Sequence, residues 1–433
     1  MICENIGINK YNHLTFAGVD TVDLASKYGT PLYLMDEDRI RHNCRTYKKA
    51  MAEAFGEDAL PLYASKAACF KRIYEIMKQE NMGIDLVSPG EIYTAVKAGF
   101  PMENSFFHGN NKTDEDIAYA IESEVGYFVA DSKYELEAIN SIAGSKGKTQ
   151  KVILRLTPGI DPHTYAAVAT GKVDSKFGIA IETGQAQQFV KEALKYENIE
   201  IVGFHCHVGS QVFDEDGTVY LDAATIMLEF AADMEKCFGV KTKILNMGGG
   251  FGVRYTSADP YMDISANIHM LARHIKKVCS NLKINVPRIL MEPGRSIVAD
   301  AGMTLYSVGT IKKITGYKNY VSVDGGMTDN PRYALYGSAY TVLLANRMNE
   351  KADFVCDVVG RCCESGDIVQ PEVSLPEPER GDTIAVLTTG AYNYSMASNY
   401  NRLRRPAIVM LSEGEDYIAV KRESFEDITR NDI

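Results

Sequence analysis

"LPLYASKAAC", residues 60–69, is an apolar run that ends in a lysine. The run is typical of a short buried strand from Leu60 to Ala64, and Lys66 follows at its end. One interpretation is that Lys66 reaches water along its four-carbon stem. The other is that a lysine in a dry pocket gives up its proton readily and acts as a nucleophile. This stretch alone favours the first interpretation, so the rest of the chain has to decide.

Seven further apolar runs follow, and helix-like segments separate them. The runs cover residues 82–88, 104–110, 126–132, 151–159, 201–210, 243–252 and 288–295. Segments 88–100 and 131–143 between them are amphipathic and open on helix-capping residues. Eight strand-then-helix units over about 250 residues predict a (β/α)8 TIM-type barrel. An open, doubly wound sheet has the same alternation and is the alternative.

Polar residues lie in or just after each run. They are Lys66, Asp85, His108, Asp131, Arg155, His205, His207, Glu292 and Arg295, together with glycines 248–250. In such a barrel the strand ends face one mouth, where active sites are built. Eight polar strand ends in succession predict a polar site at one end of the barrel. Contact with solvent alone does not explain why every strand ends in this way.

The pattern changes at about residue 296. Strand-like runs then follow one another without long helical intervals, in residues 296–314, 320–326, 353–360, 383–390 and 407–413. They predict a mostly antiparallel β domain, to which the N-terminal run 31–36 can add a strand. We therefore divide the chain into a barrel, residues 34–295, and a discontinuous β domain, residues 1–33 and 296–433.

Composition excludes several classes of protein. The 433 residues are 45% hydrophobic, which suits a soluble protein with a large core, and the net charge of −11 argues against nucleic-acid partners. No run approaches the roughly 20 apolar residues that span a membrane, and the N-terminus lacks a signal-peptide pattern. Nine cysteines without metal-type pairs predict reduced thiols and a cytoplasmic location.

Two turns after the last two barrel strands have the composition of a phosphate site. "MGGGFG" (247–252) offers backbone N–H groups, and "EPGR" (292–295) adds a cation. Barrels often bind phosphate at these loops. His205 and His207 share one face of a strand. We predict no metal there, because the further ligands of a metal-binding barrel do not follow downstream.

Phosphate turns, a strand-end lysine and an imidazole plane together predict pyridoxal 5′-phosphate (PLP), bound by Lys66. Glu292 supports this hypothesis, because a carboxylate beside the pyridine nitrogen keeps that nitrogen protonated. It also argues against an alanine racemase, which needs a less protonated pyridine. The second interpretation of Lys66, as a nucleophile, is therefore preferred.

With this set in place, the chain resembles the diaminopimelate decarboxylase family of alanine-racemase-like, fold III PLP enzymes. The resemblance runs from about residue 30 to the end. It rests on "YASKA", "GIDLVSPGE", "FHGNNK", "SKFG", "HCHVGSQ", "NMGGGFG", "EPGRSIVADAG", "CESGD" and "VKRESFEDI". It implies decarboxylation of meso-2,6-diaminopimelate to L-lysine, the last step of lysine biosynthesis.

The resemblance also implies a role for individual residues. Lys66 is the Schiff-base lysine and Cys363 the proton donor. The cofactor-binding residues are Lys66, His207, Ser210, Gly249, Gly250, Glu292, Gly294, Arg295 and Tyr392. The substrate-binding residues are Arg295, Arg332, Tyr336, Glu364 and Tyr392. A guanidinium suits the distal carboxylate of the substrate, and Glu364 its distal ammonium.

Two positions depart from the family pattern. Cys362 doubles the cysteine where one is usual, and Tyr333 follows Arg332 where proline is commoner. The resemblance further implies a homodimer with shared active sites, in which Lys176 faces Asp367 across the interface. The alternatives are ornithine, arginine or carboxynorspermidine decarboxylases on the same fold, and a catalytically silent PLP-binding relative.

Overall fold

The computed structural model describes residues 2–160, 174–214 and 216–433. The chain divides into two compact units. The barrel unit comprises Asn43–Gly252 and Met262–Gly294, and the β unit comprises Met1–His42, Val253–Tyr261 and Arg295–Ile433. Among the helices that the structure describes, none is long and apolar enough to cross a membrane.

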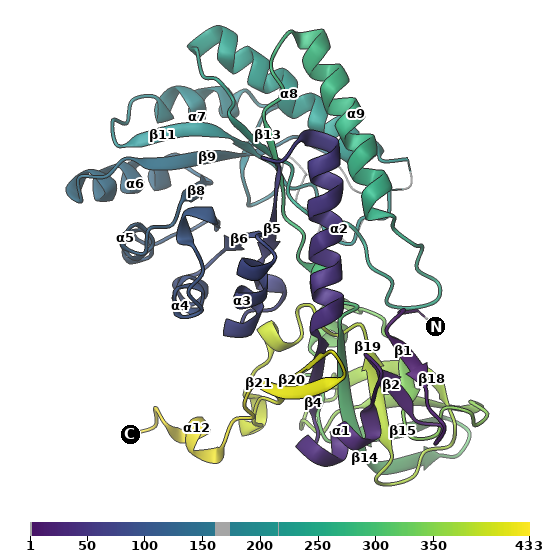
Figure 1. Cartoon of the computed structure of the whole chain (residues 1–433). Coiled ribbons are helices and arrows are strands. Elements are labelled where there is room, and N and C mark those ends of the chain that lie inside the picture. Colours follow the sequence, from purple (N-terminus) through teal and green to yellow (C-terminus); the bar gives the residue numbers. More distant parts are fainter. Residues whose placement is uncertain (1, 161–173, 215) are drawn as a thin grey trace. The chain divides into compact units, whose positions relative to one another are not determined.

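The barrel unit is a closed sheet of parallel strands, each lying within or overlapping one of the predicted apolar runs (Figure 1). The strands are β5 (Leu60–Ala64), β6 (Gly83–Leu86), β7 (Ser105–Phe107), β8 (Tyr127–Ala130), β9 (Gln150–Thr157), β11 (Ile199–His205), β12 (Ile244–Asn246) and β13 (Arg288–Met291). β13 pairs with β5 and β8 pairs with β9, so the sheet closes on itself. The barrel prediction is confirmed, and the open sheet is wrong. A short strand, β10 (Ile179–Ala180), also pairs with β9.

Helices alternate with these strands, and capping side chains set where several begin. They are α2 (Glu37–Phe55), α3 (Lys71–Gln79), α4 (Pro89–Lys97), α5 (Asp114–Glu122), α6 (Lys133–Ser145), α7 (Gln185–Ala193), α8 (Thr218–Phe238) and α9 (Ile264–Leu282). Ser88 accepts from the Glu91 N–H at the start of α4, and Ser132 accepts from the Glu135 N–H at the start of α6. Such caps satisfy backbone donors that the helix leaves open.

Seven of the eight strands contribute one buried apolar side chain each to a single cluster. Its members are Leu62, Phe106, Val129, Ile153, Val202, Ile244 and Leu290. Barrel interiors are filled by such layers of side chains, so the barrel is packed and has no pore. The polar strand ends follow this apolar layer along the chain.

The β unit contains a second sheet with the order β18-β17-β15-β14-β4-β20-β21, and β19 joins it at β14 and carries β16. The strands are β4 (Leu32–Asp36), β14 (Gly302–Ile314), β15 (Lys318–Val323), β16 (Val342–Leu344), β17 (Phe354–Val359), β18 (Ile368–Leu375), β19 (Thr383–Leu387), β20 (Ala407–Ser412) and β21 (Glu415–Val420). Among these strands only the β15–β17 and β4–β20 pairs are parallel. The prediction of a mostly antiparallel domain is confirmed.

The run 31–36 forms β4, which pairs with β14 on one side and β20 on the other. A boundary at residue 34 therefore passes through a strand of the β unit, and the division between the two units falls within α2, after His42. All five residues of β4 are buried. An apolar run of this kind fits a barrel and a central strand of a second sheet equally well, so the sequence does not fix the boundary.

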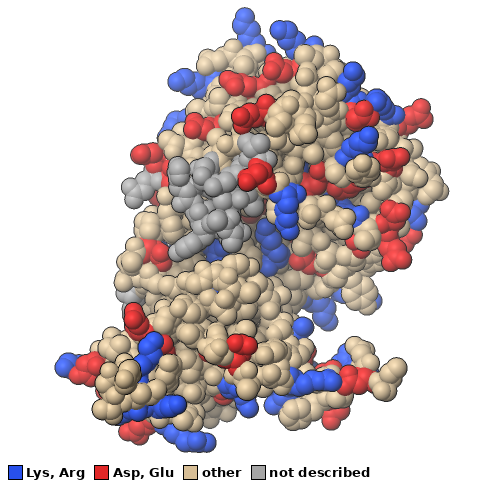
Figure 2. Space-filling model, turned by 180° about the vertical axis from the view of Figure 1, so that it is seen from behind, with Lys and Arg blue, Asp and Glu red and all other residues tan. Residues whose placement is uncertain are grey.

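Short elements complete the β unit. They are β1 (Ile6–Ile8), β2 (Leu14–Phe16), β3 (Val19–Asp20), α1 (Thr21–Tyr28), α10 (Arg295–Val298), α11 (Arg332–Tyr336) and α12 (Phe425–Thr429). The first three form a small antiparallel sheet, and Leu14 and Phe16 pack in one core with Leu32 and Leu34 of β4. Figure 2 shows acidic and basic side chains interspersed over the face in view. Among the described residues of that face, the basic side chains do not form a stripe of the kind that binds a nucleic-acid backbone.

Candidate active site

Lys66 lies in a single 3₁₀ turn, Ser65–Ala67, directly after β5. Ala64, Ser65 and Ala67 are buried, whereas Lys66 is exposed. The small residues are needed because Gly294 packs against them: a Cβ at Gly294 would lie 2.9 Å from Ala64 Cβ and 3.2 Å from Ala67 Cβ. The turn is therefore anchored to the end of β13, and the lysine amine projects from it.

Glu292 follows β13 and is the centre of a buried polar cluster. Asn246 Nδ2 donates to Oε1 at 2.7 Å, and His205 Nε2 lies 3.1 Å from Oε2. His108 Nε2 lies 2.9 Å from Oε1. His205 and Asn246 end β11 and β12, and His108 follows β7, so three further strand ends surround this carboxylate.

The cluster fixes the charge of each member. Burial raises the pKa of Glu292, but the positive charge of His108 and the hydrogen bond with His205 outweigh burial and hold that pKa well below its usual value. Burial lowers the pKa of His108, but Asp85 and Glu292 outweigh it and the pKa is raised. Burial lowers the pKa of His205 to about 4. Glu292 is therefore ionised near neutral pH and His205 is neutral.

The glycine turn after β12 lies against the same strand ends. The Gly249 N–H donates to His207 Nδ1 at 3.3 Å, and burial holds the pKa of His207 well below its usual value, so the ring is neutral. A Cβ at Gly249 would lie 2.0 Å from the Glu292 carbonyl oxygen. Gly250 has φ +117°, and a Cβ there would lie 2.1 Å from the Gly209 carbonyl oxygen. Only glycine fits at either position.

These residues fit a cofactor that has a phosphate, an aldehyde and a ring nitrogen. A glycine-rich turn is the kind of backbone segment that phosphate-binding sites use. His207 supplies a neutral plane and Glu292 an ionised carboxylate. Lys66 has an amine, which is the type of group that can bind an aldehyde. The donor types required for PLP are therefore present at one end of the barrel.

In the β unit two buried guanidinium groups lie near one phenol ring. Arg295 Cζ lies 4.8 Å and Arg332 Cζ lies 5.2 Å from the ring centroid of Tyr392. Arg295 also donates to the Tyr255 hydroxyl at 2.6 Å, and Arg332 Cζ lies 5.3 Å from the Tyr336 ring. Tyr392 has φ +64°, an unusual value for tyrosine that places it in the left-handed region. Two cations beside one aromatic ring form a site suited to anions.

The loop before Arg332 is held by a buried carboxyl group, Asp329. Tyr306 donates to Oδ2, and the Gly326 N–H donates to Oδ1 at 3.0 Å. Burial raises the pKa of Asp329 to about 7. Because this pKa is raised on folding, the associated stability is present below about pH 4, the range of an unfolded carboxyl, and is lost as the pH rises through 7.

We expect Asp329→Asn to flatten this pH dependence, because the amide keeps the contact with Gly326 and cannot ionise. The wild-type chain should lose on the order of 2–4 kcal/mol of unfolding free energy from this group between about pH 4 and 7. Urea unfolding at pH 5, 6, 7 and 8, compared between the two chains, measures the difference. Equal slopes in both chains would show that Asp329 does not titrate in this range.

Cys362 and Cys363 lie in different surroundings. Burial raises the pKa of the Cys362 thiol to about 12, and its N–H donates to Asp367 Oδ2 at 2.7 Å. Cys363 is exposed, and its N–H donates to Asn401 Oδ1 at 2.8 Å. Glu364 is also exposed. Of the two thiols, only that of Cys363 is open to a substrate.

The predicted residues fall into two groups. Lys66, His207, Ser210, Gly249, Gly250, Glu292 and Gly294 belong to the barrel unit, and Arg295, Arg332, Tyr336, Cys363, Glu364 and Tyr392 belong to the β unit. Lys176 is exposed in the barrel unit, with Nζ 4.8 Å from the Phe177 ring centroid. Asp367 is buried and accepts backbone N–H groups of its own chain from Met327 and Cys362. The pairing of Lys176 with Asp367 stays a prediction.

The structure adds residues that the sequence did not assign. His108 and His205 stood out as strand ends, but no pattern connected them to Glu292. Asn246 directly precedes the glycine turn, and its position at a strand end was an available signal. Tyr255 binds Arg295 across forty positions of sequence, and no local signal indicates it.

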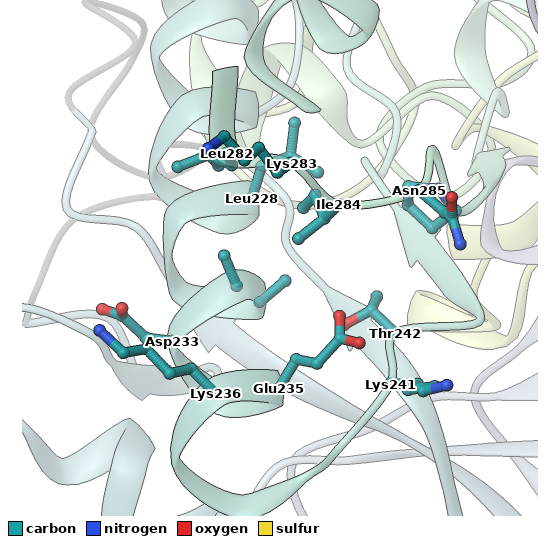
Figure 3. A pocket seen from close by; sticks show the side chains of 13 residues that line it. Leu228, Asp233, Glu235, Lys236, Lys241, Thr242, Leu282, Lys283, Ile284 and Asn285 are labelled. Atoms are coloured by element: carbon teal, nitrogen blue, oxygen red, sulfur yellow. The ribbon is translucent and has the colours of Figure 1, made fainter. Parts of the chain in front are cut away.

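A separate cavity of about 490 Å³ lies beside the C-terminal half of α8 and the segment that follows α9 (Figure 3). Thr242, which precedes β12, and Pro287, which precedes β13, belong to its lining. The cavity is therefore at the N-terminal ends of the strands, whereas Lys66 and Glu292 follow the C-terminal ends. Active sites in such barrels occupy the C-terminal ends, so this cavity is not the candidate site.

Comparison with known proteins gives the family that the sequence resembles, and the match covers nearly the whole chain. The family described as "Pyridoxal-dependent decarboxylase, pyridoxal binding domain" matches residues 37–299. The chain is 43% identical to diaminopimelate decarboxylase of Bacillus subtilis (strain 168), covering 98% of this chain and 96% of that protein. It is 41% identical to diaminopimelate decarboxylase of Staphylococcus aureus (strain COL), covering 98% of each.

Comparison with solved structures gives the same family. Diaminopimelate decarboxylase from M. jannaschii, in complex with L-lysine, matches with a TM-score of 0.91 and 32% identity, covering all of this chain and 98% of that one. The agreement extends over both units and places PLP as the cofactor. The chain belongs to the diaminopimelate decarboxylase family of pyridoxal-dependent decarboxylases.

Proposed function

We propose that this chain removes carbon dioxide from meso-2,6-diaminopimelate and releases L-lysine, as the last step of lysine biosynthesis. The observation that carries the proposal is the joint presence, at one barrel end, of an exposed Lys66, a neutral His207 and an ionised Glu292. Membership of the diaminopimelate decarboxylase family supports the same reaction.

When bound, PLP supplies the electron sink for the electron pair that remains when carbon dioxide leaves. Lys66 would hold the cofactor through its side-chain amine. Glu292 holds a proton at the pyridine nitrogen, because an ionised carboxylate favours the charged form of its partner. His207 offers a neutral ring for stacking, and the glycine turn with Ser210, Gly294 and Arg295 binds the phosphate. Cys363 delivers a proton to the carbon that lost the carboxylate.

The substrate is recognised by charges that match its far end. Diaminopimelate has a distal carboxylate in addition to a distal ammonium, whereas ornithine has only the ammonium. Arg332 binds the distal carboxylate, with Tyr336 and Tyr392 beside it, because a guanidinium grips a carboxylate with two parallel hydrogen bonds. Glu364 binds the ammonium.

Turnover of competing substrates tests this assignment. Carbon dioxide release from meso-diaminopimelate should exceed that from ornithine, arginine and carboxynorspermidine, because only diaminopimelate supplies a partner for each charged group. The comparison uses the holoenzyme at equal substrate concentrations. Faster turnover of ornithine would identify an amine-forming decarboxylase instead.

The active site is shared between two chains of a homodimer, in which the β unit of one chain completes the barrel site of the other. Lys66 belongs to the barrel unit and Cys363 to the β unit, so one site needs a contribution from both units. Lys176 pairs with Asp367 at this interface. All nine cysteines are free thiols, which suits a reducing cytoplasm.

We expect an inactive Lys66→Ala chain and an inactive Cys363→Ala chain to regain activity when they are mixed. If sites are shared, a heterodimer has one site with both residues intact and one with neither, so activity should approach about a quarter of the wild-type value after random exchange. Subunit exchange is monitored by mass spectrometry of differently tagged chains. Complete exchange without recovered activity would show that each site belongs to a single chain.

A further inference from the structure

Two buried histidines flank the Glu292 carboxylate, and the proposed chemistry gives neither of them a role. His108 Nε2 lies 2.9 Å from Oε1, and His205 Nε2 lies 3.1 Å from Oε2. The two imidazole rings meet edge to face, with centroids 5.0 Å apart. Oε2 therefore shares a hydrogen bond with His205, whereas Oε1 accepts from Asn246 and lies at ion-pair distance from His108.

The two imidazoles have different neighbours. A second carboxylate, Asp85, has its Oδ1 3.8 Å from His108 Nε2, so His108 lies between two acidic groups. The pKa of His108 is raised by both of them against burial, whereas burial lowers the pKa of His205 to about 4. Arg155 is a further charge that acts on both rings, and it lowers both pKa values.

We infer that His108 and His205 are positioning residues for Glu292: His108 keeps the carboxylate ionised by its positive charge, and His205 orients it through a neutral N–H. A carboxylate this deeply buried would take up a proton unless a cation compensated the lost hydration. The inference rests on the proposed contact between Glu292 and the pyridine nitrogen of PLP.

The ionised state of Glu292 has a measurable consequence for binding. A charged carboxylate forms a hydrogen bond with a protonated ring nitrogen that is about twice as strong as the bond between neutral groups. It is also costly to leave such a carboxylate against a C–H group. The chain should therefore prefer PLP to 1-deazapyridoxal 5′-phosphate, which has a carbon in place of the ring nitrogen.

The test compares the dissociation constants of both compounds for the full-length apoenzyme and for two variants. His108→Gln removes the charge, and His205→Gln is the matched control because its amide still donates a neutral hydrogen bond. We expect the preference for PLP to fall about tenfold in His108→Gln and to stay within about twofold of wild type in His205→Gln. If His108 had only a structural role, its substitution would weaken the binding of both compounds equally, and the ratio of their dissociation constants would not change.

The possible outcomes separate this inference from the proposed function. A wild-type chain without any preference for PLP would overturn the contact of Glu292 with the ring nitrogen. A wild-type preference that His108→Gln retains would overturn only the role of His108. If His108→Gln does not fold, His108→Asn takes its place, because it also removes the imidazole charge, and the same fall is expected.

The same residues also have the donor types of a metal site. One ligand atom each from His108, His205 and Glu292 lies within 4.8 Å of the others. Elemental analysis of the purified holoenzyme checks this directly. We expect less than about one metal ion per ten chains, which is a background level. One ion per chain would overturn the positioning role.

Discussion

The Lys66→Ala chain is expected to lose decarboxylation by several orders of magnitude, and borohydride should no longer fix PLP to the protein. The reason is the position of the amine. Lys66 projects from the turn after β5, at the barrel end where the glycine turn and Glu292 lie. Because Lys66 is the residue proposed to hold PLP covalently, its removal should leave the cofactor bound by non-covalent contacts alone.

Another lysine near the barrel strands does not replace it. Lys112 follows β7, but its ammonium is buried and donates to Glu135 at 2.5 Å and to the carbonyl groups of Gly109 and Val129. Lys97→Ala is a matched control, because Lys97 is an exposed lysine on α4 that contacts the Tyr93 ring. It should keep full activity. Near-normal turnover by Lys66→Ala would show that the barrel-end assignment is wrong.

The second large effect is expected at the doubled cysteine. Cys363→Ala should lower the rate of lysine formation by about 10²–10⁴-fold, the usual contribution of a general acid. Cys362→Ala should change it little, because the Cys362 thiol is buried in its own loop and its raised pKa, about 12, opposes proton transfer near neutral pH. The two substitutions remove the same atoms at adjacent positions, so each controls for the other.

Steady-state lysine formation in water and in deuterium oxide measures the effect. Loss of the proton donor should slow the step in which the carbon is protonated, so the solvent isotope effect should change in Cys363→Ala. In Cys362→Ala it should match the wild-type value. The opposite pattern would make Cys362 the donor and require the loop to rearrange.

The eight barrel strands could be predicted because apolar runs and capped helices are local patterns. Polar residues at the strand ends predicted a site at one barrel end, and Lys66 and Glu292 do follow the C-terminal ends of β5 and β13, while their roles stay predictions. The boundary between the units could not be predicted, because β4 has the same apolar pattern as a barrel strand. Its partners, β14 and β20, lie far along the chain.

The details of the site depend on contacts that join distant segments. Glu292 contacts His108, His205 and Asn246, which lie on three other strand ends. Such contacts are set by the closure of the barrel, and sequence spacing does not reveal them. The convergence of Arg295 and Arg332 on Tyr392 is likewise a property of the folded β unit. In both cases the sequence shows that charged residues are present, but only the structure shows which of them lie next to one another.

The central claim is PLP-dependent decarboxylation of meso-diaminopimelate, and carbon dioxide release from that compound tests it most directly. The apoenzyme is assayed with and without added PLP, and lysine is quantified in the same samples. We predict equal amounts of carbon dioxide and lysine with PLP, and neither product above background without it. A PLP-loaded, folded chain that releases no carbon dioxide from meso-diaminopimelate would contradict the proposed function.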